Sequence, residues 1–249
     1  MIFNLAKSHM SSTKLWKIVE RMPKGALLHC HLAAMVDLGW VLNTAIETDG
    51  MCIVSPIALT SVSTRQDANI AIHFRKSVDE NGASIWNESY VPGTFISLKN
   101  AADSFPVGGR DGLLNWLRQR CEVTQEESVS HHLGVDDIWR RLKKSFTFIS
   151  PIVFYEPITR AFIQRFLRTA KTNGIRWAEI RAMNFNFRRT GDEELRLDRV
   201  DEYIRVVDEE INKFMASEDS KGFWGCRMIY DTLRTWDTKT IIERRCDVA

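Results

Sequence analysis

The chain has 249 residues, of which 44% are hydrophobic and 27% charged, and its 34 basic and 32 acidic side chains leave a formal net charge of +2. This composition predicts a soluble globular protein with a sizeable core. The near-neutral charge gives no field that would favour nucleic acid or a membrane surface, so neither is expected as a partner, whereas a small neutral substrate is compatible with it.

The cysteines predict reduced, structural thiols. They are odd in number, widely spaced and without a Cys-x-x-Cys pair: Cys30, Cys52, Cys121, Cys226 and Cys246. The first eight residues lack the long apolar core and small-residue cleavage site of a signal peptide, and no apolar run reaches the length of a membrane span. We therefore expect a cytoplasmic protein.

Residues 1–21 predict one short amphipathic helix that packs on the rest of the chain. Leu15, Trp16, Ile18 and Val19 recur among lysines, and residues 11–13 offer a helix cap.

The next segment, MPKGALLHCHLAAMVD at 22–37, combines a strand-like apolar run with two potential metal ligands. Because strand side chains alternate between faces, His29 and His31 are expected on one side and Cys30 on the other. Two imidazoles on one face make half a metal site, since a catalytic zinc takes about three protein ligands and a water. Two histidines satisfied by hydrogen bonds in a strand remain the alternative.

Residues 36–45 predict a helix, and from 51 to about 130 the pattern loosens into a long insertion after the first strand. Within it, Ile70, Ile72 and Phe74 alternate as in a short strand, and residues 108–110 are interpreted as a turn rather than a phosphate loop. Such an insertion on the exit side of a strand often shapes the substrate entrance.

The pair His131-His132 precedes Asp136-Asp137, which is expected to cap a helix over 138–148. A histidine pair at a helix start is more often part of the surface than a metal ligand. Trp139 lies on the apolar face of this helix.

The last third of the chain alternates helices and strands. A helix is predicted over 157–173, a strand over 175–182, a long helix from 191 to about 214, a strand over 223–232 and a final helix capped by Asp237. In the strand at 175–182, Trp177, Glu179 and Arg181 share one face, and we expect a structural ion pair there rather than a catalytic carboxylate.

Three strands near 26–32, 175–182 and 225–232, each followed by a helix, predict an α/β fold built as a partial (β/α)8 TIM-type barrel with about three of its eight strands. The expected domains are an N-terminal helical segment at 1–21 and an incomplete barrel at 22–249, with the insertion at about 51–130. Because the final strand would have no neighbour, we expect a fragment or a truncated product.

Several segments in order resemble the adenosine deaminase-related growth factors, a family with secreted animal members and many fungal ones. These segments are MPKGALLHCHLAAMVD at 22–37, DIWRRL at 137–142, YEP at 155–157, WAEIRA at 177–182 and GCRMIY at 225–230. The resemblance covers most of residues 22–242 and suggests a fungal-type, metal-dependent deaminase.

The resemblance implies a single zinc held by His29 and His31 together with a third His and an Asp from later strands. A Glu near that third His would be the proton donor, and the reaction would convert adenosine to inosine and ammonia. Only His29 and His31 of this set are present, so no catalytic residue is assigned. Trp139 corresponds to a tryptophan at the nucleoside pocket; a core anchor remains the alternative.

The chain departs from the family in three places. Leu32 and Ala33 stand where family members have an Asp that contacts the ribose, and the segment DTLR at 231–234 lacks the His of secreted members. Little room exists for the family's dimerisation segment, which is not evident in this sequence, while a homodimer stays possible. A non-catalytic remnant or binding protein of the same fold, and another amidohydrolase-type barrel, are the competing interpretations.

Overall fold

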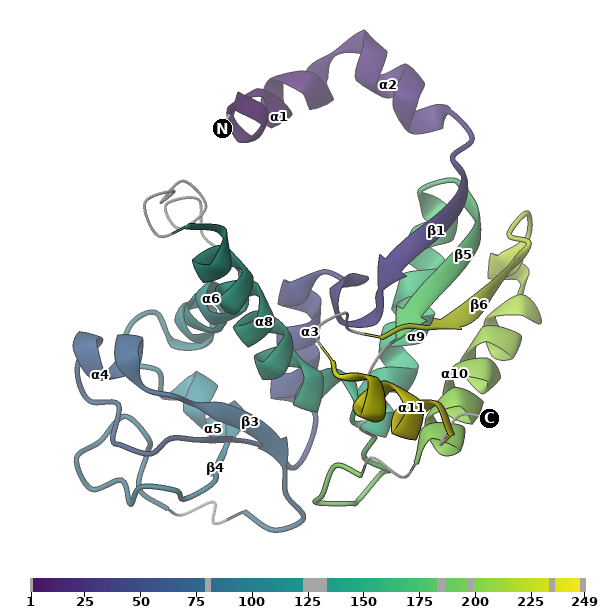
Figure 1. Cartoon of the computed structure of the whole chain (residues 1–249). Coiled ribbons are helices and arrows are strands. Elements are labelled where there is room, and N and C mark those ends of the chain that lie inside the picture. Colours follow the sequence, from purple (N-terminus) through teal and green to yellow (C-terminus); the bar gives the residue numbers. More distant parts are fainter. Residues whose placement is uncertain are drawn as a thin grey trace.

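The computed structural model describes residues 2–78, 82–122, 134–182, 187–196, 199–232 and 236–246 (Figure 1). In this part of the chain no helix is long and apolar enough to cross a membrane. The elements are, in order, α1 (Ile2–Ser12), α2 (Lys14–Arg21), β1 (Gly25–His31), η1 (Leu32–Ala34), α3 (Leu38–Glu47), β2 (Met51–Val54), α4 (Val62–Asp67), β3 (Ala71–Phe74), β4 (Ile96–Ser97), α5 (Leu98–Asp103), α6 (Gly109–Cys121), α8 (Gly134–Val153), α9 (Glu156–Thr172), β5 (Ile175–Ala182), α10 (Val200–Met215), η3 (Glu218–Ser220), β6 (Gly225–Tyr230) and α11 (Thr238–Cys246).

The first sheet is parallel and has the strand order β1-β5-β6. Helices α9 and α10 pack against one of its faces, where Ala178, Ile180 and Ala182 of β5 are buried (Figure 1). The mixed α/β fold with parallel strands is therefore confirmed. The described strands form an open sheet, so the TIM-type closure remains a prediction.

The second sheet lies inside the expected insertion and is antiparallel, with the order β3-β2-β4. The predicted short strand is present as β3, whereas β2 and β4 are additional to the expectation. Edge-to-face aromatic contacts of Trp86 with Phe105 and Trp116 stabilise this region, and the Trp86 indole donates to the Ala101 carbonyl at 2.9 Å. The insertion is thus a folded unit with its own sheet.

The N-terminal segment forms two helices where one was expected. Thr13 ends α1 and caps α2 by accepting a hydrogen bond from the Trp16 amide at 3.1 Å. No residue of α2 is buried, so the expected packing of Trp16 and its apolar neighbours against the body is wrong for this structure. Figure 1 shows both helices projecting from the start of β1.

Two other helix starts differ from the expectation. Asp137 lies inside the first turn of α8 and pairs with Arg140 and Arg141 instead of capping the helix. Helix α10 begins at Val200, and residues 187–196 form a loop. His131 and His132 lie outside the described residues. The four cysteines whose side chains are described, which exclude Cys246, are free.

Candidate metal site

His29 and His31 stand at the carboxyl end of β1 and face each other across their Nε2 atoms, which are 3.1 Å apart. The opposite side of the strand is taken by Cys30, whose thiol donates to the Glu179 carbonyl oxygen at 3.2 Å. The predicted common face of the two histidines is thereby confirmed. A one-residue irregularity in the pairing with β5 between Leu27 and Cys30 was not predicted.

The separation of the two nitrogens fits ligands of one metal ion. In a tetrahedral zinc site with Zn–N distances of about 2.0–2.1 Å, two ligand nitrogens lie about 3.3 Å apart. The same 3.1 Å also allows one imidazole to donate a hydrogen bond to the other, so the hydrogen-bonded alternative remains open. Across the described ranges, no group of three or more His, Cys, Asp or Glu side chains could hold a metal. The structure thus brings two potential metal donors together, and their role as metal ligands stays a prediction.

The other polar contacts on this open face belong to a structural ion pair formed by Glu179. Glu179 of β5 accepts two hydrogen bonds from Arg227 of β6, the shorter at 2.7 Å, and a longer one of 3.4 Å from the Trp177 indole. The hydrogen bond from Arg227 holds the pKa of Glu179 below its ordinary value against the opposing effect of burial. The predicted structural ion pair is thus present, with Arg227 rather than Arg181 as the partner.

Trp139 is 45% exposed on α8, so it is not a core anchor. Its helix packs beside η1, the turn that directly follows His31. The ring contact recorded for Trp139 is with its own helix neighbour Lys143, whose Nζ lies 5.9 Å from the ring centroid. Within the described residues, no hydrogen bond or ring contact joins Trp139 to either histidine, so its role at a nucleoside pocket stays a prediction.

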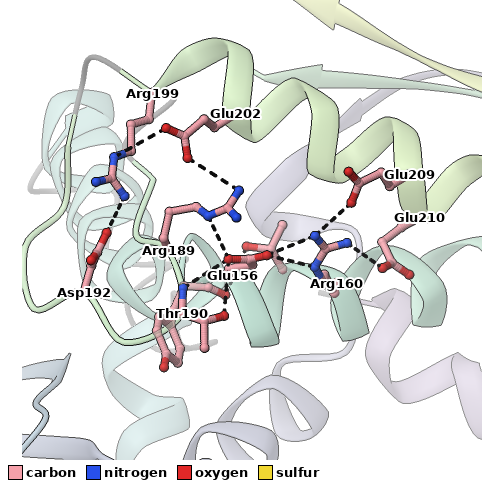
Figure 2. Close-up of polar contacts among 11 residues, drawn as sticks. Glu156, Arg160, Arg189, Thr190, Asp192, Arg199, Glu202, Glu209 and Glu210 are labelled. Atoms are coloured by element: carbon pink, nitrogen blue, oxygen red, sulfur yellow. Dashed lines mark hydrogen bonds and ion pairs between the residues drawn. The ribbon is translucent and has the colours of Figure 1, made fainter.

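A buried carboxylate that the sequence marked only as part of a YEP motif organises the segment after β5. Glu156 is 6% exposed and accepts hydrogen bonds from Arg160 and from the amide and hydroxyl of Thr190, and it forms an ion pair with Arg189 (Figure 2). Burial alone would raise the pKa of Glu156, but these donors hold it below its ordinary value. In the sequence, Arg160 stands four residues after Glu156, a spacing that predicts an ion pair within a helix. No such signal pointed to Arg189 and Thr190 as further partners.

The same network joins α9 to α10. Arg160 also pairs with Glu209 and Glu210, and Arg199 pairs with Asp192 and Glu202 (Figure 2). These contacts fix the loop at the carboxyl end of β5, the end of a parallel sheet at which α/β proteins usually place their sites. Glu156 therefore ties the start of α9 to the loop after β5.

No family model matches the sequence. Adenosine deaminase of Lutzomyia longipalpis is 22% identical over 172 residues, which are 69% of this chain and 30% of that protein. Adenosine deaminase 2-A of Danio rerio is 22% identical over 234 residues, 94% of this chain and 42% of that protein. Adenosine deaminase 2 of Sus scrofa is 27% identical over 243 residues, 97% and 43% respectively.

These relatives support an adenosine deaminase-related family. The chain spans less than half the length of each of them. The histidine pair of β1 and the parallel sheet that carries it lie within the stretch matched in the Sus scrofa protein, which takes in 97% of the chain. The similarity supports a deaminase-like hydrolase family, and the growth-factor subfamily remains a prediction.

Proposed function

We propose that this chain forms the N-terminal part of an adenosine deaminase-like, metal-dependent hydrolase, which converts adenosine or a related adenine nucleoside and water to inosine and ammonia. The observation that carries the proposal is the 3.1 Å approach of His29 Nε2 to His31 Nε2 at the carboxyl end of a parallel strand. The names of the three relatives, all adenosine deaminases, support the choice of reaction.

In this proposal the two imidazoles bind zinc through Nε2, and each carries its ring proton on Nδ1. When bound, zinc supplies a water acidic enough to ionise near neutral pH, as hydrolysis of a purine amine requires. Trp139 offers its exposed ring as a surface for the base. The remaining ligands and the proton donor belong to later strands of the barrel, so we propose that the described chain is inactive by itself.

The side chains of Leu32 and Ala33 affect which substrates the proposed site can recognise. Neither side chain can accept a hydrogen bond from a ribose hydroxyl, and Leu32 is buried in the core. Adenine compounds that do not depend on a ribose contact at this position are therefore included in the proposed substrate class.

Zinc titration by calorimetry tests the assignment of the ligands. We expect the 249-residue chain to bind one zinc weakly and exchangeably, because two imidazoles supply only half of a structural or catalytic ligand set. His29→Ala and His31→Ala should each abolish this binding, whereas His9→Ala, in exposed α1, should leave it unchanged. Zinc binding that survives both substitutions would remove the basis of the proposal.

A non-catalytic remnant or binding protein of the same fold is the second candidate, because the described residues bring only two metal donors together. The native product, captured from its source with antibodies against this chain, separates the two. Chelator-sensitive release of ammonia from adenosine supports the deaminase, and a captured product of any mass without this activity supports the remnant.

A further inference from the structure

Arg188 is a buried cation for which the described residues supply no direct ion pair. It lies in the loop after β5, is 3% exposed, and donates from Nη1 to the Phe74 carbonyl at 3.3 Å. Its Nε has no hydrogen-bond partner, and no carboxylate of the described residues forms an ion pair with it. A buried charge is normally paired because desolvation is costly, so an unpaired guanidinium indicates a missing partner.

A second guanidinium without an ion pair among the described residues belongs to Arg75, which directly follows Phe74, the residue whose carbonyl accepts from Arg188. Arg75 follows β3, stacks over the Phe95 ring at 4.0 Å, and has a buried Nε without a partner. Burial and the charge of Arg75 lower the pKa of Arg188, while burial and both arginines lower the pKa of His73. The hydrogen bond from Arg188 to the Phe74 carbonyl places Arg188 beside the end of β3. His73 and Arg75, on either side of Phe74, both pack on the Phe95 ring, so the three side chains lie where the second sheet meets the post-β5 loop.

The backbone holds this cationic cluster in place. The Arg188 amide donates to the Phe154 carbonyl at 3.0 Å and its carbonyl accepts from the Glu156 amide at 2.8 Å. The Arg75 amide donates to the Gly50 carbonyl at 2.8 Å. These hydrogen bonds fix the main chain from which the two like-charged side chains extend.

The acidic residues nearby are engaged elsewhere. Asp192 pairs with Arg199, and the Glu193 carboxylate accepts the Lys76 amide at 2.9 Å. Both act on Arg188 through their charge, but neither forms an ion pair with Arg75 or Arg188. Within the described residues, neither guanidinium is therefore neutralised by a direct ion pair.

We propose that a phosphate group, free or as a monoester, binds between Arg75, Arg188 and His73. Guanidinium groups match the oxygens of phosphate in paired hydrogen bonds, and a neutral imidazole adds one more donor. Phosphate has enough oxygens to accept from all three side chains at once, whereas a carboxylate has two. Because Arg75 and His73 are only half-buried, a ligand can approach from their side. The site is independent of the histidine pair and of the deaminase proposal.

Calorimetric titration of the 249-residue chain tests the site, with inorganic phosphate and ribose 5-phosphate as probes and acetate at equal ionic strength as the control anion. We expect saturable binding of phosphate at one site. Arg75→Gln should weaken it about tenfold or more, because it removes charged donors. The matched variant Arg176→Gln, an exposed arginine at the start of β5 that leans on Trp224, should bind as the wild type does.

Arg188→Gln should abolish phosphate binding. If the Arg188→Gln variant fails to fold, the affinity of the Arg75→Gln variant for phosphate is the deciding measurement. Equal affinity for the two probes supports a site that recognises the phosphate group alone, and tighter binding of ribose 5-phosphate supports the same site with a monoester as ligand. Binding that Arg75→Gln leaves intact, an equal response to acetate, or no saturable binding of either probe would overturn the proposal.

Discussion

A single buried carboxylate, that of Glu156, ties the start of α9 to the loop after β5. Glu156 gathers Arg160, Arg189 and Thr190, which come from a helix and from a loop that is distant in sequence. Glu156→Gln should lower the free energy of unfolding by about 2 kcal/mol, because it weakens charge-assisted hydrogen bonds and leaves cations with less compensation. Urea unfolding measures the loss, and Arg168→Ala, which breaks an exposed pair with Asp219, should cost less than about 1 kcal/mol.

The lowered pKa of Glu156 adds a pH dependence to this prediction. A carboxylate with a depressed folded pKa contributes stability above its unfolded pKa, near 4.5, and loses it as the pH falls through the folded value. The stability difference between wild type and Glu156→Gln should therefore shrink on acidification below about pH 4.5. A difference that stays constant down to pH 3 would show that the network acts without the charge of Glu156.

The residue-scale predictions from sequence succeed where one strand decides them. The common face of His29 and His31 follows from the two-residue period and is confirmed. The partner of Glu179 depends on how two strands align, and Arg227 stands directly opposite Glu179 in the β5–β6 register. A single sequence contains no direct record of that register, so this contact could not be predicted.

Elements with local start and stop signals were predicted well. Helix α9 has Pro157 in its first turn and Asn173-Gly174 at its end, β5 has the predicted bounds, and α11 begins at the Asp237 cap. The predicted start of α10 at residue 191 was wrong, since the helix begins at Val200. Residues 191–194 look like a helix cap in the sequence, but Asp192 pairs with Arg199 and Glu193 accepts a hydrogen bond from the Lys76 amide. Strand β4 has two residues, too few for a periodic pattern, and β2 is buried along most of its length without the alternation that revealed β3.

Helix α3, which follows the histidine pair, depends on a cap that can be tested. The Asp37 side chain accepts a hydrogen bond from the Trp40 amide at 2.9 Å, and the helix buries Val41, Leu42 and Ile46. Asp37→Ala should destabilise the protein by about 1 kcal/mol, whereas Asp37→Asn keeps a good cap and should lose only a few tenths. Equal losses in the two variants, measured as urea midpoints, would contradict a capping role.

At the scale of the whole molecule, three parallel strands present the histidine pair at one end of an open sheet, and a folded insertion with its own sheet follows β1 (Figure 1). The matched stretch is between 30% and 43% of the length of the relatives. The α/β class and the parallel direction of the three strands follow from the alternation of strands and helices in the sequence. The closure of the barrel, which needs strands beyond these three, remains the untested part of the fold prediction.

Ammonia release from adenosine by the 249-residue chain, with zinc supplied, tests most directly whether the chain carries half of a deaminase site. We predict no turnover above that of the His31→Ala variant, because two imidazoles without a third ligand, a carboxylate ligand and a proton donor cannot assemble the catalytic site. Measurable turnover that His31→Ala abolishes would contradict this account, since it would show that the described chain already contains a complete site.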